Sequence, residues 1–152
     1  MDMRDLPRVK EVLSNRIACA VTSPPYLDVT SFEEDQWLRL WFLGGPPHPT
    51  YGEISKDDRH QNPSKYWNMI ADMWRTLGLI LAPKSDVVIR LGGKRHTPEQ
   101  LVDGLIGAGA VSNRRIKLVR YEVSEIRNRQ TDAFRPGSIG CRLEVDCHFR
   151  IA

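Results

Sequence analysis

The sequence lacks long apolar runs and paired cysteines. No hydrophobic stretch among its 152 residues approaches the roughly 20 residues of a membrane-spanning helix, and residues 1–5 are too polar for a secretory signal. Its three cysteines, Cys19, Cys141 and Cys147, form no even disulfide set and no close-paired metal motif, and the histidines share no ligand spacing. We therefore expect a soluble cytoplasmic protein without a membrane segment, a disulfide framework or a metal site.

Charge is plentiful but unevenly distributed. The side chains are 27% charged and 41% hydrophobic, which is the balance of one globular domain. Residues 1–62 hold 7 basic and 10 acidic side chains, whereas residues 113–152 hold 9 basic and 5 acidic ones. The positive C-terminal part would favour a polyanion through counterion release, although many domains carry such an imbalance by chance.

Apolar runs and turn signals divide the first part of the chain. Residues 17–21 are apolar and end at a proline pair, which is typical of a buried parallel strand that leads into a loop. A Ser-Phe-Glu-Glu capping box predicts a helix over residues 31–43, which Gly44 ends. Residues 44–62 are rich in proline and polar side chains, so we expect a long surface loop.

The second part begins with Asn62-Pro63, an N-cap followed by proline at the first helical position. Apolar side chains then recur at spacings of three and four, so this helix should bury one face: Trp67, Ile70, Trp74, Leu77 and Leu81. A buried strand follows over residues 85–91, and a capped helix runs from Thr97 to near Gly107 or Gly109. Strict alternation over residues 141–151 predicts a strand with one buried face.

This order of elements predicts an α/β fold, an open sheet with helices on both faces. Residues 17–21 and 86–91 should form central parallel strands. The last two strands, residues 114–123 and 141–151, have no helix between them. We therefore expect them to pair antiparallel beside the parallel strands, at one edge of the sheet.

The segment Ser23-Pro24-Pro25-Tyr26 directly follows the first strand, where open α/β sheets bind ligands. The exocyclic amino group of a base is a poor nucleophile, so a site that methylates it must accept hydrogen bonds from its N–H protons. The Ser23 hydroxyl and the Pro24 carbonyl are suitable acceptors, and the proline pair would hold them rigidly. Tyr26 supplies a ring on which an extruded base can stack.

With these residues the chain resembles the bacterial and phage DNA amino-methyltransferases, whose motif is Ser, Asn or Asp followed by Pro-Pro and an aromatic residue. The similarity extends to the helix with Trp37-Leu38-Arg39-Leu40-Trp41-Phe42-Leu43-Gly44 and to residues 66–93 and 97–151. It implies site-specific methylation of a DNA base amino group with S-adenosylmethionine, as in restriction-modification systems. Ser23, Pro24, Pro25 and Tyr26 would be the catalytic residues. Serine at the first motif position leans towards cytosine N4, although some adenine enzymes also carry serine.

The resemblance also implies what is missing. Family members bind S-adenosylmethionine mainly through a Phe-x-Gly-x-Gly turn after another strand, and too few residues precede Ser23 for that unit. Gly107-Ala108-Gly109 is the sole Gly-x-Gly, and it closes a predicted helix. Residues 1–152 should therefore form a single partial Rossmann-like methyltransferase domain, the catalytic half without the cofactor half. We expect it to work with a second chain or a missing N-terminal half, or to self-associate.

Other residues are candidates for contacts. Trp37 and Trp41 could face the missing half, DNA or another copy, although burial of at least one in the core is favoured. Arg90, near the end of a predicted strand, could meet a phosphate or a cofactor carboxylate, or form a structural ion pair. Three arginines between the last two strands could contact DNA phosphates, although a solvated hairpin loop is the slightly simpler interpretation: Arg127, Arg129 and Arg135.

Two alternatives to a DNA enzyme stay open. One is methylation of another amine or amide, such as an RNA base or a glutamine side chain, although those families more often have Asn at the position of Ser23. The other is a non-catalytic remnant that serves as a binding or assembly module. A neighbouring reading frame with a Phe-x-Gly-x-Gly turn would favour the split enzyme over the remnant.

Overall fold

A computed structural model describes residues 3–14, 17–27, 32–48, 62–126 and 141–152 of the chain. Its elements begin with a 3-10 helix η1 (Met3–Arg8), helix α1 (Lys10–Ser14), strand β1 (Ile17–Thr22) and helix α2 (Phe32–Phe42). They continue with α3 (Pro63–Ile80), β2 (Leu81–Gly92), α4 (Pro98–Gly109), β3 (Ile116–Glu125) and β4 (Leu143–Ile151). The chain therefore has a mixed α/β fold.

The four described strands form one sheet in the order β1-β2-β4-β3. β1 pairs with β2 in parallel, with Val21 opposite Val88, and β3 pairs with β4 antiparallel, with Val123 opposite Val145. β4 also lies antiparallel to β2, so it is inserted between β2 and β3. The predicted parallel pair and the predicted antiparallel pair are both confirmed, in a single sheet.

The helix ends follow the capping signals of the sequence. The Asn62 side chain accepts hydrogen bonds from the backbone N–H groups of Ser64 and Lys65 at the start of α3. Thr97 and Gln100 form a reciprocal capping box at the start of α4. Gly44, with a φ of 90°, follows the end of α2 in a left-handed conformation that favours glycine. Ser31, the expected cap of α2, lies outside the described residues.

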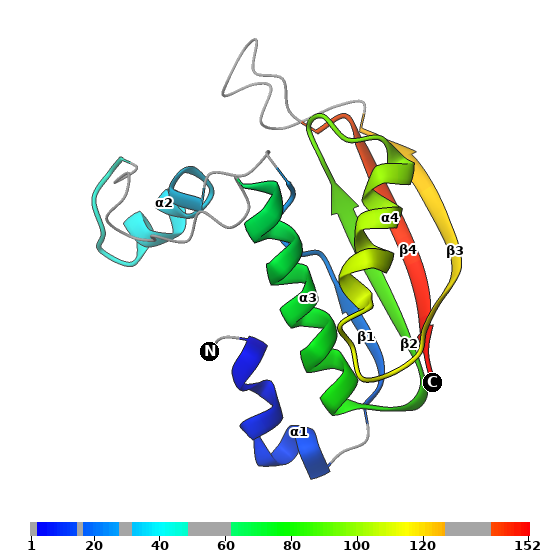
Figure 1. The fold of residues 1–152 in the computed structure, drawn as a ribbon. Helices are drawn as coiled ribbons and strands as arrows, with labels where there is room; N and C mark the ends of the chain where they lie inside the picture. Colours follow the sequence, from blue (N-terminus) through cyan, green and yellow to red (C-terminus); the bar gives the residue numbers. More distant parts are fainter. Residues whose placement is uncertain (1–2, 15–16, 28–31, 49–61, 127–140) are drawn as a thin grey trace.

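The core lies between one face of the sheet and the helices α3 and α4 (Figure 1). Trp74 of α3 lies at its centre, where its ring meets Phe149 of β4 edge to face with centroids 5.1 Å apart. The Trp74 indole N–H also donates to the Leu105 carbonyl of α4 at 3.1 Å. One fully buried side chain therefore ties both helices to the sheet.

The opposite face of the sheet carries no helix among the described residues (Figure 1). The prediction of helices on both faces is therefore wrong for this part of the chain. β1 lies at the end of the sheet rather than in its centre, and it is not buried as predicted, since Cys19 is exposed and Val21 is 76% exposed. The apolar run of β1 would be buried only if another strand or helix covered it.

Helix α2 lies apart from the sheet and its helices (Figure 1). Trp41 is 46% exposed and Phe42 is 77% exposed, and their rings lie 5.3 Å apart on the helix surface. Trp37 is only partly buried. The expectation that at least one tryptophan of α2 belongs to the core is therefore wrong, because α2 does not pack on the sheet that forms this core.

Candidate functional site

Residues 23–27 are attached to the carboxyl end of the parallel strand pair. The Leu27 N–H donates to the Gly92 carbonyl at 3.2 Å, and the Lys94 N–H donates to the Leu27 carbonyl at 3.4 Å. Leu27 thereby forms a parallel bridge with Gly93, and its side chain is fully buried. The loop after β1 is therefore held against the end of β2, at the position that the sequence predicts for a ligand site.

Tyr26 is held at both ends of its side chain. Its ring lies so close to Gly92 that a β-carbon there would be 2.7 Å from the ring carbon Cδ2. Its hydroxyl donates to Glu144 Oε1 of β4 at 2.5 Å. Burial, followed by the hydrogen bond to Glu144, raises the pKa of Tyr26 to about 12, while a hydrogen bond with Ser23 acts in the opposite direction.

The partner of Tyr26 belongs to a charged network between β2 and β4. Arg90 donates to both oxygens of Asp146, from Nε at 2.7 Å and from Nη2 at 2.6 Å, a bidentate pair. Arg90 Nη1 lies 3.5 Å from Glu144 Oε2. The hydrogen bonds raise the pKa of Arg90 and lower the pKa of Asp146. Of the two roles considered for Arg90, the structural ion pair is the one observed.

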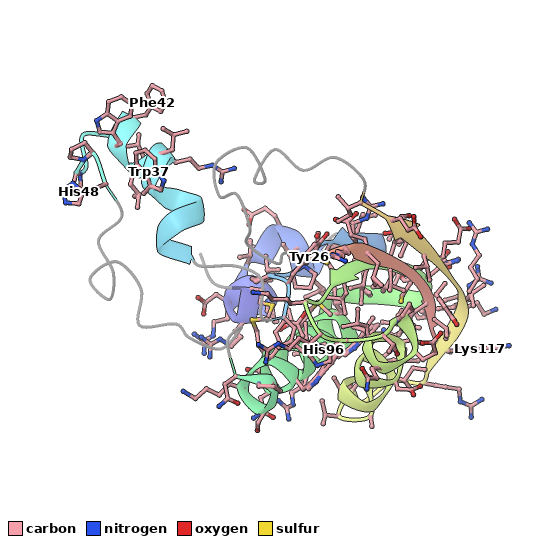
Figure 2. All side chains as sticks on the ribbon, turned by 90° about the horizontal axis from the view of Figure 1, so that it is seen from above. Tyr26, Trp37, Phe42, His48, His96 and Lys117 are labelled. Carbon is pink, nitrogen blue, oxygen red and sulfur yellow. The ribbon has the colours of Figure 1, made fainter. Side chains whose placement is uncertain are left out.

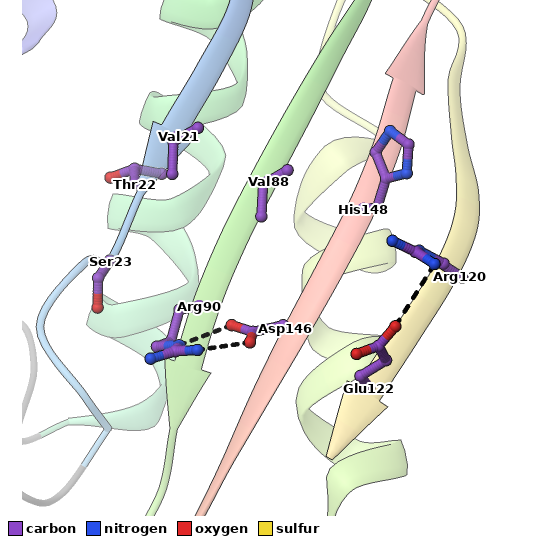
Figure 3. A pocket seen from close by; sticks show the side chains of 9 residues that line it. All are labelled: Val21, Thr22, Ser23, Val88, Arg90, Arg120, Glu122, Asp146 and His148. Carbon is purple, nitrogen blue, oxygen red and sulfur yellow. Dashed lines mark hydrogen bonds and ion pairs between the residues drawn. The ribbon is translucent and has the colours of Figure 1, made fainter. Parts of the chain in front are cut away.

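Ser23 is exposed and lines a shallow depression of about 670 Å³ on the uncovered sheet face. Figure 3 shows Ser23 beyond the end of β1, with Arg90 and Asp146 between it and β3. The depression is also lined by side chains from each of the four strands: Val21, Thr22, Val88, Arg120, Glu122 and His148.

A second charged group lies further along the same face. His148 Nε2 lies 2.8 Å from Asp86 Oδ1, and Arg150 donates to the same oxygen at 3.0 and 3.1 Å. These two partners lower the pKa of Asp86. No short-range sequence signal indicated this group, since Asp86 and His148 are 62 positions apart and meet only through the β2–β4 register.

Among the described residues, two buried side-chain polar atoms have no hydrogen-bond partner, the Tyr66 hydroxyl and His96 Nδ1. Burial raises the pKa of Tyr66, and the neighbouring Tyr26 adds to this effect. A β-carbon on Gly93 would be 3.3 Å from His96 Nδ1, so this ring lies against the strand end that Leu27 also contacts. Figure 2 shows Tyr26 and His96 in the main body of the chain, away from Trp37 and Phe42 on α2.

The structure brings Ser23 and Tyr26 together at the carboxyl ends of β1 and β2, and Pro24 and Pro25 lie between them in the same loop. Arg127, Arg129 and Arg135 lie outside the described residues. Within the described ranges, no group of three or more His, Cys, Asp or Glu side chains could hold a metal ion, and no helix is both long and apolar enough to cross a membrane. Gly107 and Gly109 lie in the last turn of α4, as predicted.

No protein-family model and no curated protein matches this sequence. Two similar solved structures are crystal structures of a candidate DNA modification methylase from Thermus thermophilus, one of them a selenomethionine derivative. Their identities to this chain are 16% and 15%, and their TM-scores are 0.47 and 0.48. They cover 98% and 99% of this chain, but the chain spans only about half of their length, 50% and 51%.

Proposed function

We propose that this chain is the target-base half of a DNA amino-methyltransferase, with the amino group of cytosine N4 as its preferred acceptor. The observation that supports it is the Ser23-Pro24-Pro25-Tyr26 loop at the carboxyl ends of a parallel strand pair. In this loop an exposed serine hydroxyl lies beside an aromatic ring that is held in place by Gly92 and Glu144. Hydrogen-bond acceptors and a stacking surface are what an extruded base with an amino group requires.

Each residue of the loop has a proposed role. The Ser23 hydroxyl and the Pro24 carbonyl accept hydrogen bonds from the two N–H groups of the base, and so orient the nitrogen for attack. Pro25 restricts the backbone of the loop, because its ring fixes φ. The Tyr26 ring stacks on the base, which compensates for part of the stacking that is lost when the base leaves the duplex.

The methyl donor of this reaction class is S-adenosylmethionine, and the described residues do not fit it. The Gly-x-Gly of the chain ends α4, where Gly109 is buried against Ile116 and Trp74, so it cannot form a cradle after a strand. We therefore propose that the cofactor is bound by another polypeptide segment, which acts together with this chain. The sheet face that no described helix covers, and the edge of β1 that no described strand pairs with, leave room for such a partner or for a second copy of the chain.

DNA is the proposed substrate, and Arg127, Arg129 and Arg135 are the proposed contacts to its phosphates. The rival role is a non-catalytic assembly module. Methylation of an RNA base or of a protein amide would use the same acceptors, so these substrates have to be compared directly with DNA.

The test is transfer of a tritiated methyl group from S-adenosylmethionine to unmethylated plasmid DNA. We expect the full chain alone to transfer none, and the chain mixed with a polypeptide that carries a Phe-x-Gly-x-Gly turn to produce N4-methylcytosine, identified by mass spectrometry of nucleosides. Tyr26→Ala should reduce transfer by about 5- to 150-fold, because stacking is worth about 1–3 kcal/mol per base. Tyr26→Phe keeps the ring and should retain most of the rate.

Two results would contradict this function. Label in RNA or protein, with none in DNA, would replace DNA as the substrate. Full transfer by a folded Ser23→Ala/Tyr26→Ala double variant would remove the loop from the reaction and leave the assembly role as the better interpretation.

A further inference from the structure

Strand β3 lies at one edge of the sheet and exposes apolar side chains there. Its neighbour among the described strands is β4, and no described strand pairs with its outer edge. Val119, Tyr121 and Val123 recur at every second position and are 47%, 41% and 48% exposed. Figure 1 shows β3 at the outer side of the sheet, beyond β4. An edge strand with exposed apolar side chains is a template for pairing with another strand.

The backbone of β3 has the geometry that such pairing requires. The Ile126 N–H donates to the Arg142 carbonyl, directly before β4, at 2.9 Å. Backbone groups alternate in direction along an antiparallel strand, so the N–H and C=O groups of Tyr121 and Val123 point away from β4. The irregularity in the β3–β4 register lies before Arg120. Residues 120–125 therefore present regularly spaced donors and acceptors to a further strand.

Two opposite charges flank Tyr121 on this strand. Arg120 and Glu122 both line the depression on the sheet face that no described helix covers. They pair with each other at 3.5 Å and are 71% and 68% exposed (Figure 3). A positive and a negative side chain therefore stand one residue before and one residue after Tyr121, on the same face of the sheet.

We propose that the outer edge of β3 is an interface between two copies of this chain, in which the two β3 strands pair antiparallel around a two-fold axis at Tyr121. In this arrangement Arg120 lies opposite Glu122 of the partner subunit, and Val119 lies opposite the partner's Val123. The two-fold axis produces each of these pairs twice. The sheets of the two copies become one continuous sheet.

Charge selects this register over the adjacent ones. Opposite residues of an antiparallel pair lie on the same face, so the adjacent registers have their axis one residue away. An axis at Arg120 would place two arginines opposite each other, and an axis at Glu122 would place two glutamates opposite each other. Like charges directly opposite destabilise a strand pair, whereas opposite charges stabilise it. Of these three registers, the one centred on Tyr121 is stabilised by its charges.

This dimer does not depend on the proposed function of the loop after β1. β1 and β3 lie at opposite ends of the described sheet, so the edge of β1 stays available for the segment that binds the cofactor. The paired surface is small, and small interfaces are weak. We therefore expect a dissociation constant on the order of 10 μM.

Sedimentation equilibrium of the full chain at low salt tests the dimer. From about 1 to 500 μM chain, the apparent mass should rise from 17.4 kDa towards twice that value. Arg120→Glu and Glu122→Arg should each weaken association about 10-fold or more, because each variant places like charges opposite each other at two symmetric positions. Both positions are exposed, so both variants should fold like the parent, as checked by circular dichroism.

Mixing the two variants tests the register itself. In a mixed dimer, the glutamate introduced at position 120 of one chain faces the arginine introduced at position 122 of the other, so association should return to about the parent affinity. A fluorescent label on one variant would follow the mixed dimer. The Arg120→Glu/Glu122→Arg double variant should dimerise like the parent for the same reason. Arg75→Glu makes an equal change of charge on α3 and should leave association unchanged.

Each outcome bears on the dimer alone. A parent chain that stays at 17.4 kDa over the whole range would overturn it, and so would association that both folded single variants retain at full strength. Weakened single variants with no recovery in the mixture would reject the axis at Tyr121. Weakening in both single variants, with recovery in the mixture and in the double variant, supports the interface. None of these results depends on methyl transfer, which is measured separately.

Discussion

Gly92 at the end of β2 and Tyr26 in the loop after β1 are in close contact. A β-carbon on Gly92 would lie 2.7 Å from Cδ2 of the Tyr26 ring and 2.5 Å from the sulfur of Cys141. Both neighbours are confined, because Tyr26 is hydrogen-bonded to Glu144 and Cys141 is fully buried. The absence of a side chain at Gly92 therefore determines where the Tyr26 ring can lie.

Gly92→Ala should displace the Tyr26 ring from this position. We expect the affinity for a DNA duplex with one bulged cytosine, a probe for an extruded base, to fall about as much as in Tyr26→Ala, about 5-fold or more. Overpacking should also destabilise the fold by about 1–3 kcal/mol. Gly107→Ala is the matched control, since a β-carbon there meets nothing within 4 Å. It should leave binding unchanged and stabilise α4 by about 0.5–1 kcal/mol. Equal binding by both variants would contradict the assigned position of the ring.

Ser23→Ala should reduce methyl transfer by the reconstituted enzyme more than it reduces DNA affinity. The serine oxygen accepts from the amino group, and this hydrogen bond strengthens as the nitrogen attacks, so its loss raises the barrier. Single-turnover rates should fall about 10-fold or more. Because Ser23 is exposed, the midpoint of thermal unfolding should stay within the error of the parent value. A parent-like single-turnover rate would remove Ser23 from the reaction.

Alkaline unfolding should report the environment of Tyr26. Its pKa is about 12 in the folded chain against 10.0 for an ordinary tyrosine, so the folded state keeps a proton that the unfolded state releases. This contribution to stability is present below pH 10 and is lost as the pH rises towards 12. The free energy of unfolding in urea would be measured at about pH 9 and pH 11 for the parent and for Tyr26→Phe. Between these pH values the parent should lose up to about 1 kcal/mol more than the variant, after allowance for solvent screening. Cys147 is present in both proteins and does not depend on Tyr26, so its titration cancels in the comparison, whereas the pKa of Tyr66 loses the smaller contribution of Tyr26 in the variant.

The salt dependence of DNA binding should show whether the three arginines between β3 and β4 in the sequence contact DNA phosphates. If Arg127, Arg129 and Arg135 each contact a phosphate, replacing all three by alanine should reduce the slope of log affinity against log salt by about 0.9 per contact. Arg75→Ala is a suitable control, because Arg75 pairs with Asp72 within α3. An unchanged slope in the triple variant would show that these three arginines do not contact the DNA phosphates.

Local signals were sufficient for most of the secondary structure. Asn62, Thr97 and Gln100 act through backbone groups two or three residues away, so their caps could be recognised from the order of residues alone. Alternation over residues 141–151 likewise predicted β4, whose odd-numbered side chains from Val145 to Ile151 are fully buried. The loop Ser23-Pro24-Pro25-Tyr26 was recognised as a candidate site for the same reason, since its residues are contiguous.

Burial could not be predicted in the same way. The apolar composition of residues 17–21 suggested a covered strand, but burial depends on what lies beside the strand, and no described element covers the outer edge of β1. The tryptophans of α2 were misassigned for the same reason. An amphipathic or apolar pattern indicates that a surface can be buried, whereas the partner that buries it belongs to the rest of the fold.

The sequence by itself determined the elements from β1 onward, the caps of α3 and α4, the parallel and antiparallel strand pairs and the position of the loop after β1, because each depends on residues close together in the chain or on the order of the elements. The short helices η1 and α1 were not predicted. Only the tertiary structure decided which groups meet at that loop. Glu144 reaches Tyr26, and Arg90 reaches Asp146, through the pairing of β2 with β4. These two contacts join residues 118 and 56 positions apart, and a shift of one residue in the β2–β4 register would turn Glu144 and Asp146 to the opposite face of the sheet.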